Sequence, residues 1–382
     1  MTDASHGRAS RVIRRTVVAL VLVVVVGLAG IGWYYSDQIL TPGGGALEET
    51  VTQVLAFDGD TVTLDATDDA VAPGQYLVSW EAGGGGYAQI CDIVASGGGD
   101  VTREVWELDG TLSPGMTVTF DGAWYPQDPA AAFDFPVEEV TYANDLGEFP
   151  AYLDRADGGT TWAVLVHGRG ATRQETFRMM GVLHDLGMPS LAITYRNDAD
   201  APASRSGRYG LGSTEWSDLA AAVRWATGEG AERIVPVGMS TGAQVVSTFL
   251  HRAPEADLVD AVIFDAPVLD WGPVLRAAAR ERGLPTALTS VAMLVAQLRG
   301  IPWDELDQVS RAADFDDPIL LFHGTADATV PVATSDAFAA AREDLVSYVR
   351  VEDAGHVRSW NVDPEDYETA VREFLATAGF AS

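Results

Sequence analysis

The fold is decided by RIVPVGMSTGAQVVSTFL, residues 233–250. Its first six residues predict a buried strand, and its last eight predict a helix. Between them lies Gly238-Met239-Ser240-Thr241-Gly242, a pentapeptide of the form G-x-S-x-G. A serine at such a strand-to-helix turn projects from the edge of a sheet, and the flanking glycines let neighbouring backbone approach without a side-chain clash. Because a serine hydroxyl is a poor nucleophile on its own, the segment predicts a site in which a base activates Ser240.

Strands and helices alternate on both sides of this segment. Buried strands are predicted by WAVLVHG (162–168), LAITYR (191–196), LVDAVIFDAP (258–267), PILLFHG (318–324) and LVSYVRV (345–351), and two further strands by 137–143 and 147–155. Helical spacing occupies residues 172–186, 213–225, 241–251, 333–342 and 364–377. This alternation predicts an α/β fold with a mostly parallel sheet and helices on both of its faces.

The alternation stops at about 267–315, where we expect a helical cap over the carboxyl edge of the sheet. Helices are predicted at 273–282, 288–298 and 303–312. The middle one, in LTSVAMLVAQLRG (288–300), is apolar on most of its circumference. Such a helix packs on its neighbours or faces a ligand or a membrane. If it lines an apolar substrate pocket, Met293 and Leu294 are the expected contacts.

The base for Ser240 has to be a histidine, because the histidine pKa lies near the working pH. Of six histidines, His356 is the one predicted at the carboxyl edge of the sheet, in a loop after the strand 345–351. The orienting acid is expected to be Asp327, in HGTADATVP, which completes the chain order Ser, Asp, His. Asp265 and Asp270, which follow the preceding strand, are the alternatives.

The negative charge that develops on a substrate oxygen needs two backbone N–H donors. Thr241, directly after the nucleophile, is expected to supply one, and Arg169, in the turn HGRG, the other. The Arg169 side chain either binds substrate or points to solvent. The polar loop 195–216 is expected to supply substrate contacts, among them Asn197 and Tyr209, although a solvated connecting loop is equally compatible with its composition.

The N-terminal segment predicts a membrane anchor. Residues 16–36 carry no charge, and about 20 apolar residues are enough to cross a bilayer. Four arginines precede this run and acidic residues follow it, which predicts a single-pass cell-membrane protein with residues 1–15 in the cytoplasm and the catalytic part outside. A cleaved signal peptide is the alternative, but the run is long for one and ends in bulky Trp33-Tyr34-Tyr35.

The remaining domain boundaries are predicted where the residue pattern changes. Residues 37–46 are predicted to be a linker, residues 47–130 a small β-rich domain with period-two strands and Gly-rich turns, and residues 131–382 the α/β domain with its cap. The hairpin VTQVLAF-Asp58-Gly59-DTVTLDA is the clearest element of the β-rich domain, because Asp-Gly accepts the positive φ of a tight turn.

Charge and cysteine content exclude some functions. The net charge is −31 and the basic residues are all arginine, so binding to nucleic acid is disfavoured. The single cysteine, Cys91, cannot form an internal disulfide and has no cysteine partner for a metal site. Composition does not determine the oligomeric state.

The motifs HGRG, GMSTG, HGTADATVP and AGHVRSW together resemble the α/β-hydrolase superfamily. The similarity covers about residues 137–380 and is strongest to membrane-anchored bacterial hydrolases of the prolyl-oligopeptidase and dienelactone-hydrolase-like groups. The resemblance implies a triad of Ser240, Asp327 and His356, oxyanion donors at Arg169 and Thr241, and no metal or organic cofactor. The β-rich segment lies outside the resemblance and is too short for a β-propeller.

The leading expectation is a hydrolase that cleaves a carboxylic ester through an acyl-enzyme. Because fold and triad do not decide the substrate, a serine peptidase or an acyltransferase stays open. The substrate would be a small-molecule ester or a peptide. A hydrolase fold that only binds its ligand is a third possibility, and the complete set of motifs argues against it.

Overall fold

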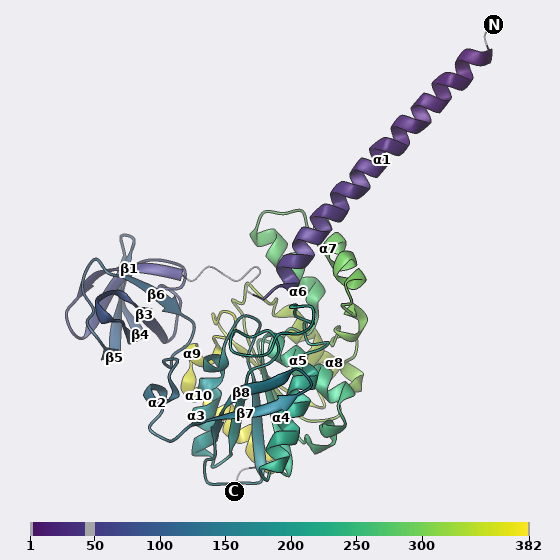
Figure 1. Ribbon diagram of the computed structural model, residues 1–382. Coiled ribbons are helices and arrows are strands. Elements are labelled where there is room, and N and C mark those ends of the chain that lie inside the picture. Colours follow the sequence, from purple (N-terminus) through teal and green to yellow (C-terminus); the bar gives the residue numbers. More distant parts are fainter. Residues whose placement is uncertain (1–2, 43–49, 381–382) are drawn as a thin grey trace.

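A computed structural model describes residues 3–42 and 50–380 and has three parts: a long N-terminal helix, a β-barrel and an α/β domain (Figure 1). Helix α1, Asp3–Leu40, contains the predicted span 16–36. Among the described residues it is the one helix long and apolar enough to cross a membrane. Residues 37–40, expected to belong to a linker, are helical instead, because Leu40 is buried in the core of the α/β domain. The later part of that predicted linker, residues 43–46, lies outside the described residues.

The β-rich segment forms a closed barrel. Its strands are β1 Thr50–Phe57, β2 Thr61–Asp65, β3 Tyr76–Trp80, β4 Gly86–Gly97, β5 Asp100–Asp109 and β6 Thr117–Asp121, in the order β1-β2-β5-β4-β3-β6. The period-two pattern is confirmed: Val62 and Leu64 belong to the barrel core, while Thr63 between them is half-buried. Gly59, at the predicted hairpin turn, has φ of 106°.

The α/β domain is built on an eight-stranded sheet in the order β14-β13-β12-β11-β9-β10-β8-β7. The strands are β7 Glu138–Asn144, β8 Gly147–Asp154, β9 Thr161–Val166, β10 Ser190–Ile193, β11 Arg233–Met239, β12 Val262–Asp265, β13 Ile319–Gly324 and β14 Val346–Val351. Neighbours from β10 to β14 pair in parallel, whereas β7 and β8 are antiparallel at one edge. The central strands are buried from end to end, as their continuous apolar runs predict.

Helices cover both faces of this sheet, so the prediction of an α/β-hydrolase fold is confirmed. One core contains residues of α4 Trp216–Gly228, α5 Thr241–Arg252 and α8 Ala333–Ala341. The opposite core contains residues of α3 Phe177–Asp185 and α10 Pro364–Thr377. The short helices α2 Pro129–Ala132 and α9 Ser359–Val362 lie toward the barrel (Figure 1).

Two of the three predicted cap helices are present, α6 Trp271–Glu281 and α7 Ala287–Leu298. The third, expected at 303–312, is wrong: single 3₁₀ turns at Trp303–Glu305 and Ala312–Asp314 stand in its place. The Asp307 carboxylate accepts the Ser310 N–H at 3.0 Å, and the Gln308 N–H donates to the Leu269 carbonyl at 2.7 Å. Both bonds compete with those of a continuous helix.

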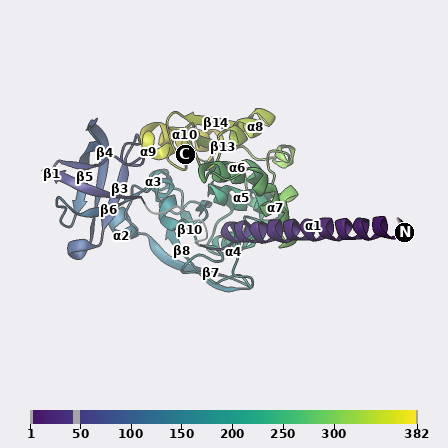
Figure 2. The ribbon, with the colours of Figure 1, turned by 90° about the horizontal axis from the view of Figure 1, so that it is seen from above.

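Helix α1 and the barrel lie on different sides of the α/β domain (Figure 2). The barrel contacts α9 through the ion pair Arg358–Asp69 at 2.6 Å and through the Gln75 N–H, which donates to the Asn361 carbonyl at 2.9 Å. The last turns of α1 lie beside α7, where a Cβ added to Gly32 would stand 2.8 Å from Val295. The cap is therefore the part of the α/β domain nearest to the apolar helix.

Candidate active site

Ser240 occupies the sharp turn between β11 and α5, with φ of 53° and ψ of −116°. A positive φ is strained for a residue with a side chain, and such strain concentrates at functional sites. The flanking glycines make the turn possible. A Cβ on Gly238 would lie 2.5 Å from the Ala243 nitrogen, and one on Gly242 would collide with the Val166 carbonyl oxygen. The G-x-S-x-G spacing therefore has a steric reason in this chain.

His356 links Ser240 to an acid. Its Nε2 lies 2.9 Å from Ser240 Oγ, and its Nδ1 lies 2.7 Å from Asp327 Oδ2. With the proton on Nδ1, the imidazole donates to Asp327 and accepts from the serine hydroxyl, the arrangement that general-base activation requires. Ser240 follows β11, Asp327 follows β13 and His356 follows β14, so the carboxyl edge of the parallel sheet gathers the three.

The charges in this row are mutually supportive. Burial alone would raise the pKa of Asp327, but His356 and His323 together hold that pKa below its ordinary value. Burial alone would lower the pKa of His356, but Asp327 raises it above its ordinary value. His323 was not among the expected site residues; its Nε2 lies 3.2 Å from Asp327 Oδ2. The result is a carboxylate that stays ionised and favours an imidazolium beside it.

The two alternative acids make other contacts. Asp265 is buried, and its oxygens accept from the Tyr367 hydroxyl at 3.2 Å and the Ser359 hydroxyl at 3.3 Å. Burial raises the pKa of Asp265 to about 6. Asp270 caps α6, where its carboxylate accepts the Gly272 N–H at 2.7 Å. Of the three candidates, Asp327 is the one that the structure joins to His356.

The expected oxyanion donors lie on either side of Ser240. Thr241 is the first residue of α5, and the first N–H groups of a helix have no partner within it. The turn containing Arg169 approaches so closely that a Cβ on Gly168 would lie 3.0 Å from the Ser240 Cβ. Glu175, which sequence reasoning missed, accepts the Gly168 N–H at 2.6 Å and holds this turn in place. Its place inside the predicted helix 172–186 carried no signal of that role.

The Arg169 side chain is turned toward the end of α1 and is held there by hydrogen bonds. Its guanidinium donates to the Gln38 carbonyl at 2.9 Å and to the Thr41 carbonyl at 3.4 Å, at the end of α1. It also lies over the Tyr209 ring, with 5.6 Å to the ring centre. Tyr209, expected as a substrate contact, is buried and does not line the cavity that contains Ser240.

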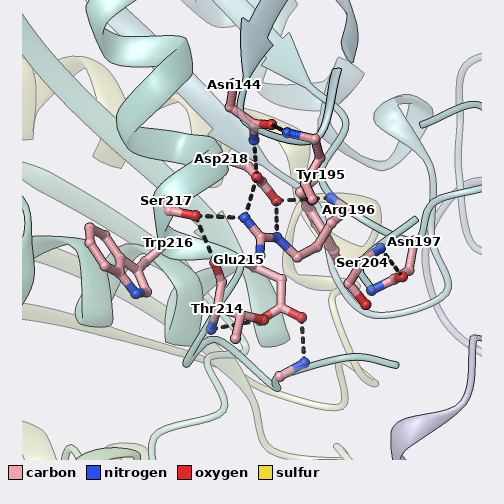
Figure 3. Close-up of polar contacts among 12 residues, drawn as sticks. Asn144, Tyr195, Arg196, Asn197, Ser204, Thr214, Glu215, Trp216, Ser217 and Asp218 are labelled. Atoms are coloured by element: carbon pink, nitrogen blue, oxygen red, sulfur yellow. Dashed lines mark hydrogen bonds and ion pairs between the residues drawn. The ribbon is translucent and has the colours of Figure 1, made fainter. Parts of the chain in front are cut away.

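Asn197, also expected as a substrate contact, is bonded within its own loop and does not line the cavity. Its amide donates to the Arg208 carbonyl at 2.9 Å and its oxygen accepts the Ser204 N–H at 2.9 Å, as Figure 3 shows for Ser204. Beside it, the Arg196 guanidinium pairs with Asp218 at 2.8 Å (Figure 3). These bonds close the loop on itself and leave Asn197 buried.

A cavity of about 750 Å³ extends from Ser240 and His356 toward the cap and α1. The cap lines it with residues of α6 and, from α7, with Leu288, Thr289 and Ala292. Met293 and Leu294 were expected to line it and do not, because successive residues are about 100° apart around a helix and these two face elsewhere. Leu294 is 56% exposed.

The end of α1 supplies part of the cavity wall, which the sequence did not reveal. Tyr34, Tyr35, Gln38 and Ile39 line the cavity together with the cap. The rings of Tyr34 and Tyr35 indicated a membrane boundary, and Gln38 and Ile39 lay in the predicted linker. Nothing local indicated that these turns would pack over a site more than 200 residues later in the chain. Helix α1 and the candidate active site are thus physically continuous.

The turn at Ser240, the sheet below it and the row of Ser240, His356 and Asp327 are typical of a serine hydrolase with the α/β-hydrolase fold. Residues 182–378 match the model of the prolyl oligopeptidase family. The chain belongs to this family. Residues 53–121 match a domain of unknown function, DUF8805, which corresponds to the barrel.

Among curated proteins, the chain is similar to the uncharacterized protein Rv2307c of Mycobacterium tuberculosis. The two are 28% identical over 228 residues, which are 59% of this chain and 73% of the relative. Among solved structures, the esterase Pf2001 of Pyrococcus furiosus has a TM-score of 0.52 and 22% sequence identity, and the match covers 64% of this chain and 91% of the esterase. A second crystal form of that esterase gives a TM-score of 0.51 at 21% identity, with 64% and 90% covered. These structural likenesses show a shared fold.

Proposed function

We propose that this protein is a membrane-anchored serine hydrolase that cleaves a carboxylic ester, with Ser240 as nucleophile, His356 as base and Asp327 as orienting acid. The observation that carries the proposal is the unbroken row of contacts, 2.9 Å from Ser240 Oγ to His356 Nε2 and 2.7 Å from His356 Nδ1 to Asp327 Oδ2. The row ends in a cavity large enough for an acyl chain.

The proposed reaction has two steps, acylation of Ser240 and hydrolysis of the acyl-enzyme. Ser240 Oγ attacks the ester carbonyl carbon while its proton moves to His356 Nε2, and the alcohol then leaves with that proton. Water next attacks the acyl-enzyme and gives one proton to His356, which returns it to Ser240 as the carboxylic acid departs. In both halves the backbone N–H groups of Arg169 and Thr241 stabilise the negative oxygen, a contribution of about 3–4 kcal/mol for one such donor in comparable enzymes.

An ester is favoured over a peptide by the walls of the cavity. Much of its lining is aliphatic or aromatic, including Val268, Trp271, Val274, Leu275 and Leu288. An acyl chain gains free energy from every methylene buried on such a surface, about 0.8 kcal/mol each. The family name makes a peptidase the second candidate, and the fold is compatible with either.

Purified full-length protein should hydrolyse p-nitrophenyl esters with kcat/KM rising from acetate to medium acyl chains, because each added methylene is buried in the cavity. Release of p-nitrophenol checks this. Matched p-nitroanilides of the same acyl groups and prolyl peptides serve as controls. Faster cleavage of the amides than of the esters would replace the esterase assignment with the peptidase.

We also propose that residues 16–36 cross the cell membrane, with residues 1–15 in the cytoplasm and residues 37–382 outside. The part outside comprises the predicted β-rich domain at 47–130 and the α/β domain from 131. The run without charge and the arginines before it support this orientation.

A tag at the C-terminus should be digested by protease added to intact cells, while a tag at the N-terminus is protected. Protection of the C-terminal tag would reverse the orientation, and a mature N-terminus after Trp33 would indicate a cleaved signal.

A further inference from the structure

Helix α7 runs beside the part of α1 that would lie in one leaflet of the bilayer. A Cβ on Gly32 would stand 2.8 Å from Val295 and 2.9 Å from Val291, so the two helices are in close contact there. The Arg299 guanidinium, just after α7, donates to Ser36 Oγ at 2.6 Å and pairs with Asp37 at 2.5 Å. Along α7, residues 291, 295 and 299 thus contact α1 between Gly32 and Asp37. The start of α7 therefore lies deeper in the apolar run of α1 than the end of α7 does.

The face of α7 that turns away from the domain is uncharged and uncovered, and two leucines stand on it beside Ser290 and Gln297. Leu294 is 56% exposed and Leu298 is 79% exposed, in a helix that contains no charged residue. Trp33 and Tyr34 of α1 are 56% and 59% exposed at the same level. Water-exposed leucines in a helix are costly, whereas the same side chains are stable in the interface of a bilayer.

The opposite face of the same helix lines the cavity. The cavity lining includes Leu288, Thr289 and Ala292 of α7 and Tyr34, Tyr35 and Ile39 of α1. The cavity therefore extends from Ser240 to two helices that both carry exposed apolar side chains. Figure 1 shows α1, α6 and α7 together on the side of the domain from which the long helix leaves.

From this geometry we infer that the substrate is a long-chain acyl ester of a lipid in the same membrane that holds α1, and that its acyl chain enters the cavity along α1 and α7. This inference rests on the proposed ester hydrolysis and adds the substrate class and its route. The leucine face of α7 sits in the headgroup and upper acyl region of the leaflet. Because the anchor is itself a wall of the cavity, a lipid reaches Ser240 without crossing water.

The test uses the full-length protein in phosphatidylcholine vesicles, with a phosphatidylcholine that carries a fluorogenic acyl chain as the membrane substrate and p-nitrophenyl acetate as the soluble one. The double variant Leu294→Glu/Leu298→Glu places two charges on the α7 face outside the cavity. We expect the rate on the vesicle lipid to fall on the order of tenfold or more, because two apolar contacts with the leaflet are replaced by charges, while acetate hydrolysis stays unchanged.

The matched control is Val51→Glu/Val94→Glu, which changes two barrel residues that are 56% and 50% exposed. This control should keep both activities. An unchanged rate of the α7 variant on the vesicle lipid, or an equal loss on both substrates, would overturn the inference. A fluorogenic diacylglycerol in the same vesicles separates a phospholipid from a neutral lipid, and cleavage of either one supports the acyl-ester class.

A second variant acts from inside the cavity. Ala292→Phe fills the space beside α1, and should reduce cleavage of the long-chain lipid on the order of tenfold more than cleavage of acetate. Equal reductions would contradict passage of the chain at this point. If the parent protein cleaves acetate and medium-chain esters but no vesicle lipid, the inference fails and the proposed function stands. If it cleaves no ester at all, the proposed function itself fails.

Discussion

Replacing Ser240 with alanine should abolish ester turnover, a loss on the order of 10⁶ in kcat, because in enzymes of this kind the nucleophile and base act as one unit. The hydroxyl is the only group of the triad that bonds to the acyl carbon, so the variant should also lose covalent labelling by a fluorophosphonate probe. The fold should persist, since the change removes one oxygen and keeps the positive φ that the flanking glycines permit. Labelling followed on a gel, together with ester kinetics, measures both effects.

Ser247→Ala is the matched control for that experiment. Ser247 lies two turns further along α5 and donates to the Ala243 carbonyl at 2.7 Å. The control variant should label and turn over like the parent. Retained labelling of Ser240→Ala would place the nucleophile elsewhere and end the assignment.

Replacing Asp327 with asparagine should reduce kcat by about 10⁴, because the amide favours the wrong imidazole tautomer and removes the charge that stabilises the imidazolium. Asp327 Oδ1 also accepts the N–H groups of Thr329 and Val330, at 2.9 and 2.8 Å, which the amide oxygen can retain, so the loop should keep its shape. Ester kinetics and thermal unfolding on the same sample separate lost catalysis from lost folding.

The pH profile gives a second measure of the same change. Asp327 raises the pKa of His356, and the base works in its neutral form, so activity rises as pH passes upward through that pKa. Without the carboxylate the pKa of His356 falls, and the acidic limb of the residual kcat/KM should move to lower pH. A limb at the parent position would show that Asp327 does not act through His356.

Asp265→Asn is the control for the choice of acid. Burial raises the pKa of Asp265 to about 6, so the folded protein disfavours the ionised carboxylate. Above that pH a neutral amide avoids the free-energy cost of this buried charge, and we expect it to be tolerated. Its carboxylate oxygens accept from Tyr367 and Ser359 rather than from His356. Most activity should therefore remain, and a loss equal to that of Asp327→Asn would show that Asp265 is the orienting acid.

The sequence by itself determined the elements whose cause is local. The alternation of buried strands with helices predicted the sheet, the period-two pattern and Asp58-Gly59 predicted the barrel hairpin, and the glycines around Ser240 predicted the nucleophile turn. The placement of Asp327 and His356 was also predictable, because residues that directly follow parallel strands meet at one edge of the sheet. In each case the deciding sequence signal lies within a few residues along the chain.

Only the tertiary structure decided which faces meet. The third cap helix was lost to side-chain and backbone bonds at Asp307 and Gln308, and the cavity face of α7 turned out to be that of Ala292 rather than Leu294. The side chain of Arg169 bonds to the Gln38 carbonyl, 131 residues earlier in the chain, and so joins α1 to the turn beside Ser240. Hydropathy records whether a side chain avoids water but not which distant surface covers it. The wall that α1 contributes to the cavity therefore becomes visible only when the whole chain is folded.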